Sequence, residues 1–132
     1  MLDFLEKEIG FLGVKVKMQS LEDIRQGVAK FAKERDWDQF HSPKNLTMAL
    51  SVEVAELMEH FQWLSEEQSR NLDDETLKEV AKELADVQVY VVRLADRLNI
   101  DLFNAVTTKM QENAQKYPAD KVRGSAKKYN QY

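Results

Sequence analysis

The sequence contains few of the residues that interrupt helices or cross-link a chain. Its 132 residues include no cysteine, four glycines, two prolines and two histidines. The lack of cysteine excludes a disulfide framework and a thiolate metal site. The scarcity of glycine and proline, together with 32% charged residues, favours a helical fold. The length is sufficient for one domain with a sizeable core.

Long apolar runs and a secretory leader are also missing. No apolar stretch approaches the roughly 20 residues that cross a bilayer, so we expect no membrane partner. The N-terminus lacks the basic start and the small-residue cleavage site of a signal peptide. We therefore expect a cytoplasmic protein.

Charge is distributed unevenly along the chain. The net charge is −4, but residues 109–132 contain six basic and two acidic residues, a balance of +4 that leaves −8 for the remainder. General nucleic-acid binding requires a basic surface, so the acidic body makes a nucleic-acid partner unexpected. The basic residues of the C-terminal segment are Lys109, Lys116, Lys121, Arg123, Lys127 and Lys128.

The spacing of apolar and capping residues predicts four long helices. Residues 1–19, interrupted by two glycines, are treated as an N-terminal extension, and residues 20–132 as one helical domain with a polar, irregular tail from residue 118. The long helices are predicted over 20–36, 43–64, 73–99 and 101–117, with a short helix after Ser65. Short connections and regular apolar seams indicate an all-α four-helix bundle.

Two pairs of carboxylates stand out on these helices. Glu53 and Glu56 are three residues apart on the second long helix, and Glu83 and Asp86 are three apart on the third, so each pair shares a helix face. Glu53 also falls in the apolar seam, where a carboxylate without a partner is costly. Two such pairs brought together form an all-oxygen site that suits Mg²⁺ or Mn²⁺, and through the cation a phosphate-rich ligand.

Other interpretations of the acidic residues remain open at this point. Pairing with Lys78 and Lys82 explains individual carboxylates as ordinary surface residues, and acidic rows also suit a non-catalytic helical scaffold with a basic partner. A di-iron site requires two Glu-x-x-His motifs, whereas His60 follows Glu56 by four residues and Glu59 by one. Zinc is disfavoured because it prefers nitrogen and sulfur ligands.

Aromatic residues accompany the acidic pairs. Trp37 and His41 lie in a loop before the second long helix, Trp63 lies near its end, and Tyr90 is one turn beyond Asp86. A flat base could stack among such side chains while its phosphates reach the metal. Ordinary core packing is the alternative explanation for each aromatic residue taken alone.

Four segments together carry a family resemblance. They are Phe-His-Ser-Pro-Lys-Asn-Leu at 40–46, Glu-Val-Ala-Glu-Leu-Met-Glu-His-Phe-Gln-Trp at 53–63, Glu-Leu-Ala-Asp-Val at 83–87 and Asn-Ala-Gln-Lys-Tyr-Pro at 113–118. In this order they resemble the MazG-type nucleotide pyrophosphohydrolases, especially the small single-domain branch typified by dCTP pyrophosphatase. The resemblance covers about residues 21–128 and departs from the usual Glu-Glu-x-x-Glu motif at Val52.

The resemblance implies a reaction and an assembly. The reaction is hydrolysis of a nucleoside triphosphate between its α and β phosphates, giving the monophosphate and pyrophosphate. The implied substrate is a deoxynucleotide such as dCTP or a modified dCTP, in nucleotide-pool housekeeping. A dUTPase-like all-α nucleotide hydrolase is the alternative. The implied assembly is an all-α homodimer or homotetramer with active sites between subunits.

The resemblance also implies a set of site residues. Mg²⁺, with Mn²⁺ as a substitute, is expected on Glu53, Glu56, Glu83 and Asp86, and one of the first two is expected to orient the attacking water or take its proton. Base contacts are expected near Trp37, His41, Trp63 and Tyr90, with His41, Asn45 and Gln62 as polar candidates at the base edge. Phosphate or sugar contacts are expected at Asn113, Lys116 and Tyr117.

Overall fold

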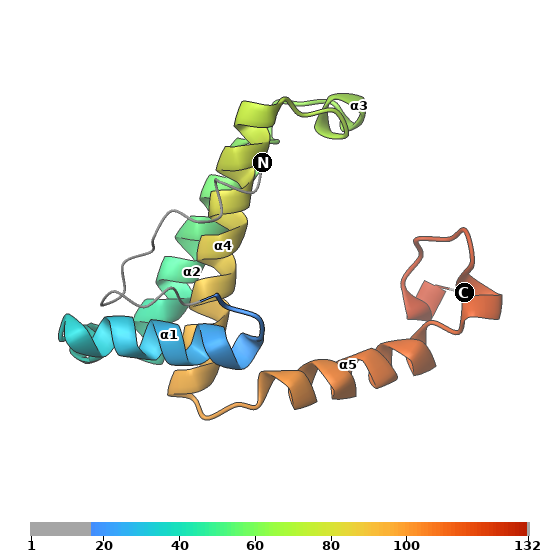
Figure 1. The fold of residues 1–132 in the computed structure, drawn as a ribbon. Coiled ribbons are helices and arrows are strands. Elements are labelled where there is room, and N and C mark those ends of the chain that lie inside the picture. The colour runs from blue at the N-terminus through green and yellow to red at the C-terminus, as the bar shows by residue number, and fades with distance from the viewer. Residues whose placement is uncertain (1–16, 132) are drawn as a thin grey trace.

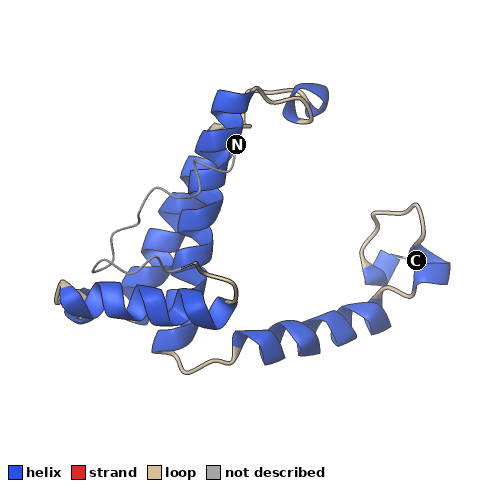
Figure 2. Ribbon diagram, in the orientation of Figure 1, coloured by secondary structure: helices blue, strands red, loops and turns tan. Residues whose placement is uncertain are grey.

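All regular elements in the described part of the chain are helical. The structure, a computed structural model, describes residues 17–131 (Figure 2). Its long helices are α1 (Leu21–Glu34), α2 (Pro43–Glu59), α4 (Asp74–Arg97) and α5 (Leu102–Lys116), and its short ones are η1 (Asp38–Phe40), α3 (Glu66–Ser69), α6 (Ala119–Val122) and η2 (Tyr129–Gln131). The all-α prediction is confirmed. Among the described residues, none of these helices has the length and apolar character needed to cross a membrane.

Side-chain caps determine where the main helices begin. A side-chain oxygen accepts a hydrogen bond from the backbone N–H three residues later at Ser20, Ser42, Ser65, Asp73 and Asp101. Each cap satisfies an N–H group that has no partner within its helix. The starts predicted from the sequence are therefore confirmed.

The ends of the helices differ more from the prediction. α2 ends at Glu59, before the predicted end at residue 64, because the N–H groups of His60 and Phe61 donate to carbonyls three residues back and tighten the chain into turns. The prediction of an irregular tail was wrong in part, since α6 and η2 form within it after Pro118 ends α5. The predicted extension, 1–19, lies outside the described residues except for 17–19, which are not helical.

The core lies where three long helices meet. α2 and α4 run antiparallel and side by side, and α1 packs across α4 near its C-terminal end (Figure 1). Leu46 of α2 is the largest fully buried side chain, with 1% of its surface exposed, and the other buried apolar residues are Ala32, Val80, Val92 and Ala95. This packing turns the carboxylate-bearing parts of α2 and α4 toward each other.

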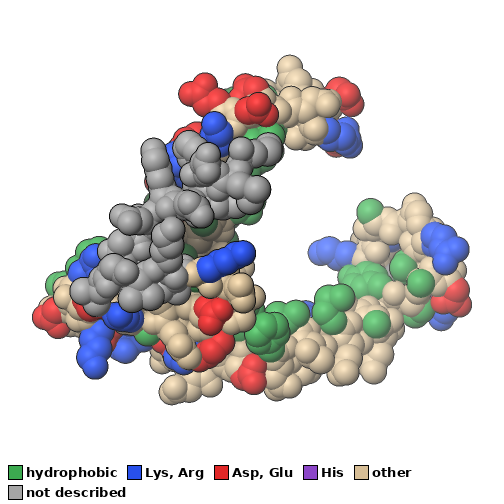
Figure 3. All heavy atoms as spheres, viewed as in Figure 1, with side chains coloured by type: hydrophobic (Ala, Val, Ile, Leu, Met, Phe, Trp, Pro, Cys, Tyr) green, Lys and Arg blue, Asp and Glu red, His purple; other side chains and the backbone are tan. Residues whose placement is uncertain are grey.

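The fourth long helix lies apart from the other three within one chain. α5 extends away from the α2–α4 pair, and no other described helix packs against it as α4 does against α2 and α1 (Figure 1). Phe103, Val106 and Met110 follow 3–4 spacing on α5 and are each more than half exposed. Figure 3 shows hydrophobic side chains gathered along the side of α5 that is turned toward the rest of the chain. A single chain therefore leaves this apolar face uncovered.

Replacing Leu46 tests the packing between the helices. We expect Leu46→Ala to lower the free energy of unfolding by about 2–5 kcal/mol, because it removes buried methyl groups and leaves a cavity. Urea denaturation monitored by circular dichroism measures the change. Thr47→Ala, at the neighbouring exposed position of α2, is the control and should stay within about 0.5 kcal/mol of the unmodified protein. Equal effects of the two substitutions would contradict the assignment of Leu46 to the core.

Candidate functional site

Three carboxylates converge between α2 and α4. One oxygen each from Glu53, Glu56 and Glu83 lies within 4.8 Å of the other two. Glu53 and Glu83 are half-buried and Glu56 is exposed, so the cluster opens to solvent on one side. Carboxylate oxygens gathered in this way are the ligands that Mg²⁺ takes in proteins.

Glu83 provides the test of whether a cation fits this cluster. Its Oε2 atom is buried and has no hydrogen-bond partner among the described residues. Its Oε1 atom lies 3.9 Å from Nε2 of His60, a distance beyond a hydrogen bond. A buried carboxylate oxygen without a partner is costly, and a bound cation would satisfy it. The donor set, made only of oxygens, fits a hard divalent cation.

The electrostatic surroundings of Glu53 also favour a bound cation. Burial raises the pKa of Glu53 above its ordinary value, and the nearby charges of Glu56, Asp86 and Glu83 raise it further. Asp86 is exposed and is not among the three converging carboxylates, but its charge acts on Glu53 and on Tyr90. The structure therefore brings three of the four predicted ligands together and places the fourth beside them.

Of the predicted aromatic contacts, Tyr90 lies beside the carboxylate cluster. Tyr90 is half-buried on α4, and its pKa is raised by burial and then by the charges of Glu53 and Asp86. Trp63 follows α2 and is 87% exposed, so one chain leaves both faces of its ring accessible. Trp37 follows α1, is 43% exposed, and packs edge-on against Phe31 at a ring-centroid distance of 5.6 Å.

His41 lies in a network of charged side chains. Its Nδ1 atom accepts a hydrogen bond of 3.0 Å from Nε of Arg93, and its carbonyl accepts one from Nε of Arg97. Burial lowers the pKa of His41, with the charge of Arg93 as the next cause. No role was predicted from the sequence for Arg93 or for its partner Asp38. The only signal in the sequence concerns Arg93, which follows Asp86 and Tyr90 at 3–4 spacing along α4.

The remaining polar candidates are exposed. Asn45 donates from Nδ2 to the carbonyl of Phe40 at 3.0 Å, which ties the start of α2 to η1. Gln62 lies in the turn after α2. Asn45 therefore has a structural contact within the chain, and its predicted contact with the base stays a prediction, as does that of Gln62.

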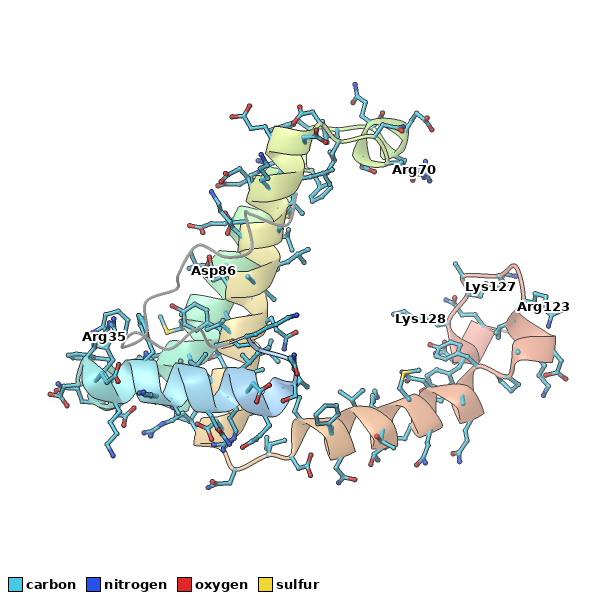
Figure 4. All side chains as sticks on the ribbon, in the orientation of Figure 1. Arg35, Arg70, Asp86, Arg123, Lys127 and Lys128 are labelled. Atoms are coloured by element: carbon cyan, nitrogen blue, oxygen red, sulfur yellow. The ribbon has the colours of Figure 1, made fainter. Side chains whose placement is uncertain are left out.

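The predicted phosphate contacts lie far from the carboxylates within one chain. Asn113, Lys116 and Tyr117 are at the end of α5, where the rings of Tyr117 and Tyr129 meet edge-on at 6.1 Å. Nζ of Lys116 lies 5.4 Å from the centre of the Tyr129 ring. Figure 4 shows Asp86 on α4, and Lys127 and Lys128 beyond α5 on the other side of the molecule. One chain does not bring this end of α5 to the acidic cluster.

A separate hollow lies away from the carboxylates. It has a volume of about 500 Å³ and is formed by α1, the end of α4 and the start of α5. Leu21, Ile100 and Phe103 are among its apolar lining residues, and Arg25 and Asp96 are among its charged ones. Because none of the four predicted metal ligands lines it, this hollow is not the candidate catalytic site.

Comparison with known proteins gives a family. The model of the MazG-like family matches residues 48–131, which include all four predicted metal ligands. Among solved structures, the chain is similar to the crystal structure of a pyrophosphatase from Archaeoglobus fulgidus, with a TM-score of 0.68 and 36% sequence identity. The match covers 80% of this chain and 98% of that one.

Curated mammalian proteins are more similar in sequence. The chain is 49% identical to dCTP pyrophosphatase 1 of Rattus norvegicus over 112 residues, which cover 83% of this chain and 66% of that protein. It is 45% identical to dCTP pyrophosphatase 1 of Homo sapiens over 114 residues, which cover 85% of this chain and 67% of that protein. The chain thus spans about two thirds of the length of these relatives.

The acidic cluster predicts an unusual effect of pH on the metal-free protein. Because the pKa of Glu53 is raised above 4.5 in the folded state, the folded protein binds this proton more tightly than the unfolded protein does. Stability should therefore fall as the pH rises from 4.5 through the folded pKa of Glu53. Near neutral pH, Glu53→Gln should stabilise the metal-free protein by an amount on the order of 0.5 kcal/mol.

Thermal melts in EDTA, above and below this pH range, measure the effect. Glu59→Gln removes a carboxylate of the same helix that lies outside the cluster and serves as the control. The gain from Glu53→Gln should disappear in acid, where Glu53 is protonated. A Glu53→Gln variant that is destabilised equally at both pH values would show that the acidic neighbours do not affect the ionisation of Glu53.

Proposed function

The chain belongs to the MazG-like family, and on this basis we propose that it is a metal-dependent nucleoside triphosphate pyrophosphohydrolase. The reaction is hydrolysis between the α and β phosphates, which gives a nucleoside monophosphate and pyrophosphate. The single observation that carries the proposal is the convergence of Glu53, Glu56 and Glu83 around an unsatisfied buried oxygen. The pyrophosphatase names of the relatives support the class of reaction.

Mg²⁺ is the proposed cation, with Mn²⁺ as a substitute. Glu53, Glu56 and Glu83 would hold it, with Asp86 as the fourth ligand from the next turn of α4. When bound, the cation supplies charge neutralisation for the triphosphate and the departing pyrophosphate, and lowers the pKa of coordinated water. A triphosphate carries several negative charges, which this acidic cluster would repel without the cation.

The residues of the chain have distinct tasks in this reaction. We assign to Glu53 or Glu56 the role of orienting a water toward the α-phosphorus and accepting its proton, because both belong to the acidic cluster. Holding the water and the phosphorus in line converts the attack into an intramolecular step, which is the main contribution of a positioning site. The departing pyrophosphate gains negative charge. Nearby carboxylates alone would repel that charge, and a bound cation would stabilise it.

A deoxycytidine nucleotide is the proposed substrate. Trp37, Trp63 and Tyr90 offer aromatic surface for a base, and the names of the mammalian relatives support dCTP or a modified dCTP. Stacking tolerates every base, so selectivity must come from polar groups at the base edge. His41, Asn45 and Gln62 are the candidates. A dUTPase-like preference is the alternative that substrate profiling separates from this one.

We propose that a second copy of the chain completes the fold and the site. The apolar face of α5, formed by Phe103, Val106 and Met110, is exposed in a single chain, and helix faces of this kind are normally buried. α5 also extends away from the α2–α4 pair, and Lys116 is its last residue (Figure 1). A homodimer or homotetramer would cover this face and place Asn113, Lys116 and Tyr117 at the triphosphate of a neighbouring site.

The cellular setting follows from the substrate and the composition. A cytoplasmic location stays a prediction, in keeping with a free nucleotide as the substrate. The acidic body of the chain continues to make nucleic acid an unexpected partner.

Pyrophosphate release from a panel of nucleoside triphosphates tests the function. With Mg²⁺ we expect release that EDTA abolishes and that is fastest with a deoxycytidine nucleotide. Glu56→Gln and Asp86→Asn should fold normally and lose at least about 100-fold in turnover, because each removes a charge needed to hold the cation. Mg²⁺ and nucleotide together should raise the melting temperature of the unmodified protein by mass action, and not that of these variants.

Glu59→Gln is the matched control for this experiment, since it removes an exposed carboxylate of α2 outside the cluster. It should retain full activity. Release with another preferred base would keep the metal site and reject the cytosine assignment. If the protein is folded and oligomeric but cleaves no triphosphate, and if Mg²⁺ does not change its stability, a non-catalytic helical scaffold is favoured instead.

Charge placed on the apolar face of α5 tests the assembly. Phe103→Asp should dissociate the oligomer, because a carboxylate buried in an apolar interface is not compensated. Light scattering coupled to size-exclusion chromatography measures the mass. Thr108→Asp, at an exposed position on the opposite face of the same helix, should leave the mass unchanged. A monomeric unmodified protein would contradict the proposal.

A further inference from the structure

One buried guanidinium connects three elements beside the aromatic contacts. The side chain of Arg93 is 4% exposed, and it donates to Asp38 of η1, to Oδ2 of Asp96 at 3.2 Å and to Nδ1 of His41 at 3.0 Å. Asp96 in turn accepts a bond of 3.0 Å from Arg25 of α1. A buried charge with several good partners is held in one orientation, because losing any partner would leave it uncompensated.

The contact between Arg93 and His41 determines which nitrogen of the imidazole carries the proton. A guanidinium can only donate hydrogen bonds, so Nδ1 of His41 must offer a lone pair to Nε–H of Arg93. The neutral ring then carries its proton on Nε2. A protonated ring would place a second N–H against that of Arg93. Burial lowers the pKa of the ring, and the charges of Arg93 and Arg97 lower it further, while the charge of Asp38 opposes them.

The position of His41 relates it to the proposed nucleotide. Asp86, Tyr90 and Arg93 follow one another along the same face of α4. Arg93 is seven positions after Asp86, which corresponds to a rise of about 10 Å along the helix. His41 therefore lies about two helical turns from the proposed metal ligands. Its ring meets the half-exposed Trp37 edge-on, with 6.3 Å between ring centroids. Trp37 therefore offers an aromatic surface for a base next to His41.

We propose that Arg93 is a positioning residue that holds His41 in the tautomer with its proton on Nε2, so that His41 donates a hydrogen bond to an acceptor on the base edge. This proposal rests on the proposed function for its substrate, but not for the tautomer. Nitrogen N3 of cytosine is an acceptor, whereas N3 of uracil or thymine carries a proton. A donor held in place would therefore favour cytosine and oppose the other pyrimidines, because a mismatched edge leaves two donors facing each other.

The tautomer can be measured without any substrate. Long-range ¹H–¹⁵N correlation spectra of the full chain distinguish a protonated Nδ1 from a protonated Nε2. The chain has two histidines, so a His41→Gln variant identifies the signals of His41. We expect His41 to be neutral and protonated on Nε2 near neutral pH. A proton on Nδ1 in the folded, unmodified protein would overturn the proposal, whatever the protein hydrolyses.

Two substitutions of Arg93 and one control connect the tautomer to base choice. Arg93→Met removes the donor, and Arg93→Lys keeps a positive charge for Asp38 and Asp96 without the planar guanidinium, which protects against misfolding. Both should give a mixture of tautomers, and Arg93→Met, which also removes a charge that lowers the pKa of His41, should raise that pKa. Both should also reduce the ratio of kcat/KM for dCTP over dUTP by about tenfold or more. Arg25→Gln disturbs the same network through Asp96 without touching His41, and should change neither the tautomer nor the ratio.

The outcomes separate this proposal from the proposed function. If the unmodified protein hydrolyses no triphosphate, the function fails, while the tautomer result still decides the role of Arg93 toward His41. If the protein prefers dCTP and a folded Arg93→Lys variant keeps both the tautomer and the preference, Arg93 does not position His41. An equal loss of preference in Arg25→Gln and the Arg93 variants would reduce Arg93 to a purely structural role.

Discussion

Repulsion among the carboxylates between α2 and α4 is the constraint on which the account of this protein depends. Glu53, Glu56 and Glu83 approach one another closely enough to share a cation, and burial followed by the charges of its acidic neighbours raises the pKa of Glu53. A fold stabilised only by its core would keep such groups apart, since like charges at this spacing destabilise the folded state. Their convergence is explained if a divalent cation and the phosphates that it binds belong to the working state of the protein.

The rest of the chain holds this acidic cluster in place. Side-chain caps set where α2 and α4 begin, and Leu46 anchors the contact that brings their faces together. At the other end of α4, the guanidinium of Arg93 connects η1, α1 and α4 through its acidic partners. One helix, α4, therefore carries Glu83 and Asp86 of the proposed metal site together with Tyr90 of the proposed base contacts, which helps to keep a phosphate and a base at a constant separation.

Local signals in the sequence were sufficient to predict the long helices and to single out the four carboxylates. They were not sufficient to predict the contacts between distant segments. Capping residues and 3–4 spacing act within one or two turns, so the helix starts and the shared face of Glu83 and Asp86 could be predicted. The buried oxygen of Glu83 and the bond from Arg93 to His41 depend on how separate helices pack, and Arg93 and His41 are 52 residues apart. The position of α5 could not be predicted either, because its apolar face suits a second chain as well as its own.

The position of isotope from labelled water tests the central claim most directly. dCTP is hydrolysed in H₂¹⁸O with Mg²⁺, and mass spectrometry locates the label in the products. Attack at the α-phosphorus, as the proposed reaction requires, places ¹⁸O in dCMP and leaves pyrophosphate unlabelled. Label in pyrophosphate, release of orthophosphate as the first product, or equal cleavage in EDTA would contradict the account.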